Sequence, residues 1–237
     1  DLIRAMRRMG EEKSFKIMMY RCYQQNTIAH ISPWILLEAM NMMKKDKIRE
    51  VMTIRDERGK TPIHILAWDN PHKLMSLMIE MGIENFVEVM TIQDEGGKTP
   101  IHILGMINPI IMSNLISFKE FLNLKEFSKI MLIQDNTGET LIDRLRASKT
   151  IDKQVDDTLK LAISKLEINE IRKALETKTN PDKSKKLVDT LKNTDEGMQI
   201  LNNLWTEDLE KDPNENEVKK LEERLNPMKL NENRLTK

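Results

Sequence analysis

Apolar residues in the first two thirds of the chain recur at helical spacing in short blocks, and polar turn residues separate the blocks. One block carries a stripe on a single helical face, made by Leu74, Leu77, Met78 and Met81. The next stretch, 83–92, repeats the spacing with Ile83, Phe86, Val87, Val89 and Met90. Blocks of about ten residues are too short to form helices that are stable alone in water. The pattern therefore predicts short helices that are stabilised by packing against neighbours.

The blocks belong to a repeated unit. The segment 51–66 returns almost letter for letter as 89–104, and both contain the phrase Gly-Lys-Thr-Pro-Ile-His-Ile-Leu. A repeated unit indicates a stacked array, which usually works by offering surface rather than by performing chemistry. With two weaker copies included, four units are marked by Thr27, Thr61, Thr99 and Thr140.

Within a unit, the residues before the threonine predict a turn that leads into a helix. Gly59 permits a positive φ, Thr61 can cap the helix and Pro62 suits its first position. A second helix is predicted to begin at Asn70-Pro71, and the spacing over 83–92 predicts a short third helix. The unit marked by Thr27 is shorter by about one helical turn. Leu2 to Met9 is expected to be the closing helix of an earlier unit.

The phrases Gly59 to Ala67 and Gly97 to Gly105 resemble the ankyrin-repeat signature T-P-L-H-x-A. The resemblance covers roughly Asp1 to Ser148 and departs from the family pattern through the extra short helix in each repeat. It implies stacked helix pairs with projecting turns, the first helix of each repeat lining a concave side. It also implies that His64 and His102 form structural hydrogen bonds near the helix start. His30 stands at the same place in the first unit, and Asp143 replaces it in the fourth.

From Lys149 the repeated phrase is absent and the composition becomes more polar. Helical spacing predicts helices over 151–166, 169–175, 180–191, 193–209 and 214–225. We therefore expect an all-α protein: an ankyrin-like solenoid of about four repeats over 1–148 and a small helical bundle over 149–237. Two interpretations of the second part stay open, a bundle packed against the last repeat or helices that dock onto a partner and are otherwise loose.

Composition narrows the possible classes of function. The 38 basic and 38 acidic residues give a net formal charge of +0, so no overall field attracts nucleic acid or a membrane surface. No apolar run reaches the roughly 18 residues that a membrane-spanning helix needs. The 17 methionines lie largely on the apolar stripes and are expected to fill the core. The single cysteine, Cys22, excludes an internal disulfide and fits a reducing, cytoplasmic compartment.

The sequence offers few candidates for chemistry. His64 and His102 recur inside the repeated phrase, which favours one structural role filled twice over catalysis. Glu95 to Thr99 lacks the first glycine of a phosphate-binding loop, and no group of cysteines and histidines converges at metal-ligand spacing. Cys22 has no assigned base and is expected to be a buried thiol. We predict no catalytic residue, no cofactor and no metal site.

A protein partner is the expected ligand. Large apolar residues at the end of the first helices, Trp68 and Met106, and their neighbours Asp69 and Ile107 are candidates for a partner-binding face. Trp68 could instead fill the space left by the missing helical turn of the first unit. The turn residues Arg58, Lys60 and Lys98 are further candidates, although such charges are commonly just solvated.

The leading hypothesis is a non-enzymatic protein–protein interaction module that binds a partner protein, with no nucleic acid and no membrane span. The alternative is a targeting or regulatory part of a larger enzyme whose catalytic domain lies outside these residues; catalysis in the C-terminal helices would need carboxylates clustered in a pocket. The origin of the chain stays open. Its Met-, Ile-, Lys- and Asn-rich composition is typical of AT-rich genomes, and intracellular bacteria use ankyrin proteins as effectors, so one alternative is a host-directed effector that is secreted into a host cell.

Overall fold

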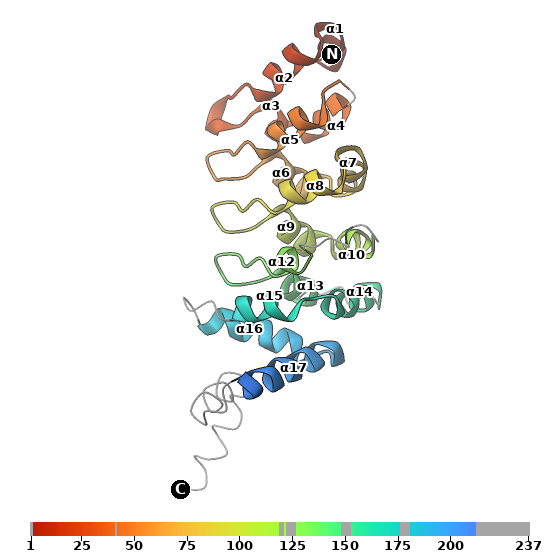
Figure 1. Cartoon of the computed structure of the whole chain (residues 1–237). Coiled ribbons are helices and arrows are strands. Elements are labelled where there is room, and N and C mark those ends of the chain that lie inside the picture. Colours follow the sequence, from red (N-terminus) through yellow and green to blue (C-terminus); the bar gives the residue numbers. More distant parts are fainter. Residues whose placement is uncertain are drawn as a thin grey trace.

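The computed structural model describes residues 2–40, 42–118, 121, 127–147, 153–175 and 181–211. Over these ranges the chain is all-α, as predicted: sixteen α-helices and one short 3-10 helix, with no β-strand among them. The helices stack in one direction from α1 to α17, and loops project from one side of the stack (Figure 1).

Among the described residues, three helices can be followed in each of the two middle units, which confirms the predicted third helix. The second unit has α6 (Pro62–Asp69), α7 (Lys73–Met81) and α8 (Ile83–Met90). The third has α9 (Pro100–Ile107), α10 (Pro109–Ser117) and α12 (Phe127–Met131). Equivalent helices lie on one another, α6 against α9 and α9 against α13 (Leu141–Ala147).

The first unit is shortened as the sequence predicts. Its first helix, α3 (Ile28–Ile31), has 4 residues, whereas α6 has 8. It is followed by α4 (Pro33–Met40) and α5 (Lys45–Thr53). Before it come α1 (Leu2–Met9), α2 (Glu11–Met19) and the 3-10 helix η1 (Tyr23–Gln25). The predicted helix over Leu2 to Met9 is thus present and packs against α2 and α4.

The C-terminal helices pack against the preceding repeats, which is the first of the two interpretations that the sequence left open. They are α14 (Lys153–Ser164), α15 (Ile168–Leu175), α16 (Pro181–Leu191) and α17 (Asp195–Lys211). Helix α14 packs beside α10 and α13, α16 lies on α13, and α17 packs on α14 and α16. These helices therefore continue the stack (Figure 1). The helix predicted over 214–225 lies outside the described residues.

The hydrophobic core is also continuous from the repeats into the C-terminal helices. A single cluster of buried side chains runs from Met6 to Leu204, and it passes the expected boundary through Leu145 and Val155. Methionine fills much of it, as predicted: the buried methionines are Met6, Met18, Met43, Met52, Met78, Met81, Met90, Met112 and Met131. Flexible thioether side chains suit the irregular gaps between short helices.

Candidate functional site

The projecting loops are tight turns with a shared construction. We call residues 21–26, 55–60, 93–98 and 134–139 the turn edge. In the second turn, Asp56 Oδ1 accepts hydrogen bonds from the backbone N–H groups of Arg58 (2.9 Å) and Lys60 (2.8 Å). Asp94 and Asp135 do the same in the next two turns. Gly59 has a φ of 70°, which glycine adopts without strain.

Hydrogen bonds join each turn to the next. The backbone N–H of Glu57 donates to the Gln24 carbonyl (3.3 Å), and that of Glu95 donates to the Arg58 carbonyl (3.1 Å). Side chains reinforce the contact, because Arg55 Nη1 donates to the Gln93 carbonyl at 2.6 Å. The turn edge is therefore a continuous ladder along the stack.

The repeated histidines hold helices and turns together. Nδ1 of His64 accepts from the Thr61 N–H (3.0 Å), so the ring proton is on Nε2, which donates to the Lys98 carbonyl of the following turn (3.1 Å). His30 makes the equivalent contacts, and so does His102, whose Nε2 lies 3.2 Å from the Glu139 carbonyl oxygen and also 3.0 Å from that of Ile133. Burial lowers the pKa of His64 to about 4 and also lowers the pKa of His30 and His102. The predicted structural role of the histidines is confirmed.

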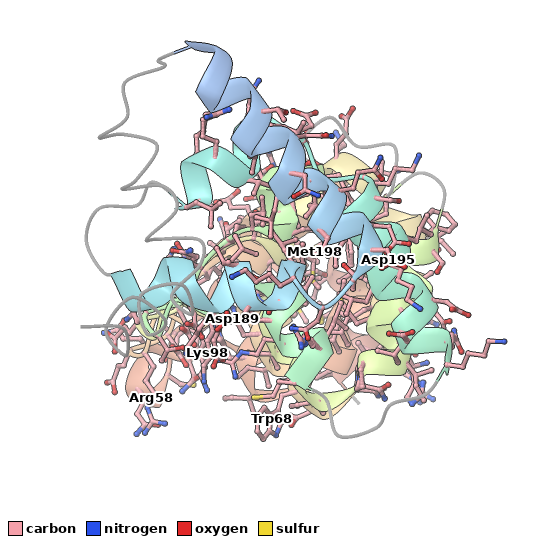
Figure 2. The ribbon with its side chains drawn as sticks, turned by 90° about the horizontal axis from the view of Figure 1, so that it is seen from below. Arg58, Trp68, Lys98, Asp189, Asp195 and Met198 are labelled. Atoms are coloured by element: carbon pink, nitrogen blue, oxygen red, sulfur yellow. The ribbon has the colours of Figure 1, made fainter. Side chains whose placement is uncertain are left out.

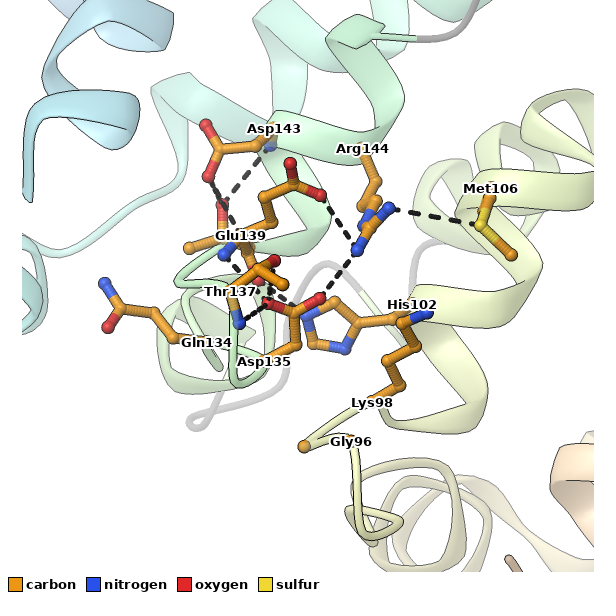
Figure 3. Close-up of polar contacts among 12 residues, drawn as sticks. Gly96, Lys98, His102, Met106, Gln134, Asp135, Thr137, Glu139, Asp143 and Arg144 are labelled. Atoms are coloured by element: carbon orange, nitrogen blue, oxygen red, sulfur yellow. Dashed lines mark hydrogen bonds and ion pairs between the residues drawn. The ribbon is translucent and has the colours of Figure 1, made fainter. Parts of the chain in front are cut away.

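In the fourth unit a carboxylate replaces the histidine. Asp143 Oδ2 accepts from the Thr140 N–H (2.9 Å) and from the Thr140 hydroxyl (2.7 Å), while Oδ1 accepts from the Thr190 hydroxyl of α16 (2.5 Å). Asp143 thus caps its own helix and also reaches the next layer of the stack. Figure 3 shows this cap beside a second cluster centred on Arg144.

Arg144 forms an ion-pair cluster that sequence reasoning missed. Its Nη2 lies 2.6 Å from Asp135 Oδ2 and 2.8 Å from Glu139 Oε2 (Figure 3). Burial alone would raise the pKa of Asp135, but hydrogen bonds from Thr137 and Arg144 outweigh it and lower the pKa to about 2. Alignment of the repeats could have revealed this cluster, because Arg144 stands four residues after its marker threonine, where the preceding units have Ile65 and Ile103. Lys186 Nζ lies 3.2 Å from Glu139 Oε1, and with this lysine the two carboxylates and two cations balance in charge.

Large apolar side chains are exposed on the first helices of successive units. We call Ile31, Trp68, Met106 and Ile107 the apolar strip; they are 63%, 57%, 41% and 37% exposed. They lie on α3, α6 and α9, of which α6 packs on both α3 and α9. Trp68 therefore does not fill the space beside the shortened first unit. Asp69, the last residue of α6, is exposed beside it.

The predicted basic residues lie on the turn edge. Arg58 is exposed, Lys60 and Lys98 are half-buried, and none of the three forms an ion pair with any residue that the structure describes. Figure 2 shows Arg58 and Trp68 projecting outward along the same edge of the molecule. The structure therefore brings the apolar and basic candidates to neighbouring parts of one surface. Ile31 is an addition that the sequence analysis did not select.

Cys22 is exposed, not buried as expected, because it lies in the first turn, where its Sγ is 3.1 Å from the Asn26 carbonyl oxygen. Within the described ranges, no cluster of three or more histidine, cysteine, aspartate or glutamate side chains is arranged to hold a metal ion.

Comparison with protein-family models, with curated proteins and with solved structures finds no match for this chain. None of the helices that the structure describes combines the length and apolar character needed to cross a membrane.

Proposed function

We propose that this protein is a non-enzymatic protein-interaction module, an ankyrin-like array that binds a partner protein through the apolar strip and the neighbouring turn edge. The observation that carries the proposal is the exposure of Ile31, Trp68, Met106 and Ile107 on three successive first helices. A partner that covers them removes apolar surface from water.

Several local features support the ankyrin-like interpretation. Thr61 and Thr99 precede helices that start with proline, and each following histidine bridges to the next turn. The third helix of each unit widens the spacing beyond the usual ankyrin pattern. A host-directed role and a cytoplasmic location stay expectations that accompany the resemblance.

Trp68 is the residue on which we expect the partner's affinity to depend most. Tryptophan is enriched among the residues that dominate binding energy, because its large rigid side chain buries much surface at little entropic cost. Met106, on the next helix, adapts its shape to an irregular partner surface. Neither side chain is needed to fill the core, so both can be removed without opening a buried cavity.

The test is affinity capture from a eukaryotic cell lysate with the wild-type chain and with Trp68→Ala/Met106→Ala. A matched control, Ile79→Ala/Leu161→Ala, removes exposed apolar side chains from α7 and α14 instead. Circular dichroism establishes that all three proteins are folded. Proteins retained by the wild type and the control but lost by the strip variant support the proposal, and purified candidates then give the affinity. Equal retention by all three proteins contradicts it.

A further inference from the structure

Resting on the proposed function, we infer that the apolar strip binds an extended peptide segment that carries acidic residues beside its apolar anchors, with the acidic part lying over the first two turns. The apolar strip supplies the anchor sites. The charge distribution along the turn edge supplies the polarity and therefore the orientation of the segment.

Formal charge changes from positive in the first two turns of the turn edge to negative in the last two. Arg21 is the one charged residue of the first turn, 21–26, which therefore carries +1. The second turn, 55–60, also carries +1. The third, 93–98, carries −1, and the fourth, 134–139, carries −2. The positive turns therefore precede α3 and α6, the helices that carry Ile31 and Trp68 at the N-terminal end of the apolar strip.

The positive charges at this end lack acidic partners among the described residues. Arg21 and Arg55 donate to backbone carbonyls of the following turns, while Arg58 and Lys60 form no ion pair. By contrast, the negative fourth turn is compensated: Asp135 and Glu139 pair with Arg144, and Glu139 also pairs with Lys186. The surface field that a partner meets is thus positive over the first two turns and close to neutral over the fourth.

The acidic residues of the second turn are already counted in its net charge, and Glu95, whose backbone N–H donates to the Arg58 carbonyl, is counted in the third turn. The Asp56 carboxylate is occupied by two backbone N–H groups of its own turn. Glu57 is the one other acidic residue in that turn. Asp69 ends α6, so it lies about 12 Å along the helix axis from the end that adjoins the turn. It is beside the anchor site for apolar residues rather than beside Arg58 and Lys60.

The same distance sets the spacing within the bound segment. Trp68 is near the far end of α6, and the basic turn precedes the near end. An extended chain covers about 3.4 Å per residue, so roughly four residues separate the apolar anchor from the acidic group. A segment with a large apolar residue and an aspartate or glutamate at about this spacing matches both parts of the surface.

The experiment is selection of random 16-residue peptides displayed on phage against the immobilised wild-type chain, with removal of phage that also bind Trp68→Ala/Met106→Ala. Enriched peptides are then synthesised and measured by fluorescence anisotropy. We expect acidic residues and large apolar residues to be enriched together. Charge reversal by Arg58→Glu/Lys60→Glu is expected to weaken binding by about tenfold or more, and less so at high salt.

The control charge reversal is Lys73→Glu/Lys129→Glu, which changes two exposed lysines on α7 and α12 and is expected to change the affinity less than about twofold. Arg58→Ala/Lys60→Ala provides a milder change if the reversal disturbs folding. Trp68-dependent peptides that lack acidic residues, or that bind Arg58→Glu/Lys60→Glu as tightly as wild type, would overturn the inference and leave the proposed function standing. Selection that yields no Trp68-dependent peptide would overturn the proposed function as well.

Discussion

At the residue scale, the position two before the marker threonine has a left-handed backbone conformation in each turn. Gly59, Gly97 and Gly138 occupy it with φ values of 70°, 72° and 79°. In the first turn the position is Gln25, with a φ of 60°. A side chain in this left-handed conformation costs about 1 kcal/mol or more, which glycine avoids.

We predict that Gln25→Gly raises the free energy of unfolding by about 1 kcal/mol. The substitution loses an exposed acceptor for Arg21 Nη1 at 3.0 Å, which contributes little. Gly59→Ala is the converse control and should lower the free energy of unfolding, because its added Cβ would lie 3.0 Å from the Glu95 backbone nitrogen. Urea unfolding followed by circular dichroism measures both. A destabilised Gln25→Gly would contradict the assignment of strain to this turn.

At the element scale, the additional third helix of each unit is part of the core. In α8 the ring of Phe86 is fully buried, whereas Ile79 on the preceding helix α7 is exposed. Removing a buried aromatic side chain loses its transfer free energy and leaves a cavity.

Phe86→Ala is therefore predicted to lower the free energy of unfolding by about 3 to 5 kcal/mol. Ile79→Ala, its control, is predicted to change it by less than about 0.5 kcal/mol. Both values come from denaturant unfolding. Similar stabilities for the two variants would show that α8 is an appendage and not part of the stack.

The helices after residue 147 are also predicted to stabilise the array. A chain ending at residue 147 exposes the sides of α10 and α13 that α14 and α16 cover. We expect a clear loss of stability, because each unit of a stack depends on its neighbours for burial. Thermal unfolding of the shortened and full-length chains tests this. Equal midpoints would indicate an independent C-terminal domain instead.

At the scale of the whole molecule, the three buried histidines make stability depend on pH. Each must stay neutral to accept at Nδ1 from the threonine N–H. Since burial lowers the folded-state pKa of His64 to about 4, from 6.5 in the unfolded chain, its contribution is complete above pH 6.5 and declines as the pH falls toward 4.

His64 alone is predicted to lower the free energy of unfolding by roughly 2 kcal/mol between pH 7 and pH 5, and His30 and His102 change it in the same direction. The lowered pKa of Asp135 changes the free energy of unfolding only below about pH 3.8, the ordinary pKa of the side chain. It therefore does not contribute between pH 7 and pH 5. Urea unfolding at the two pH values measures the change. His72→Gln, at an exposed position, should show the wild-type dependence. Equal stability at pH 7 and pH 5 would contradict a bridging role for the histidines.

Much of the fold and part of the site could be predicted from local chemistry. Helix starts at Pro62 and Pro100, the shortened α3 and the third helices follow from capping residues and apolar spacing, which act over three or four residues. The sequence left two alternatives for Trp68, exposed or filling a gap, and the burial expected for Cys22 was wrong, since helical spacing alone does not specify which neighbours cover a side chain. The Arg144 cluster and the position of α14 against α10 were decided by tertiary contacts. Several of those contacts join residues that are tens of positions apart in the sequence. After residue 148 the repeated phrase is absent, so the sequence does not indicate which helices pack against each other.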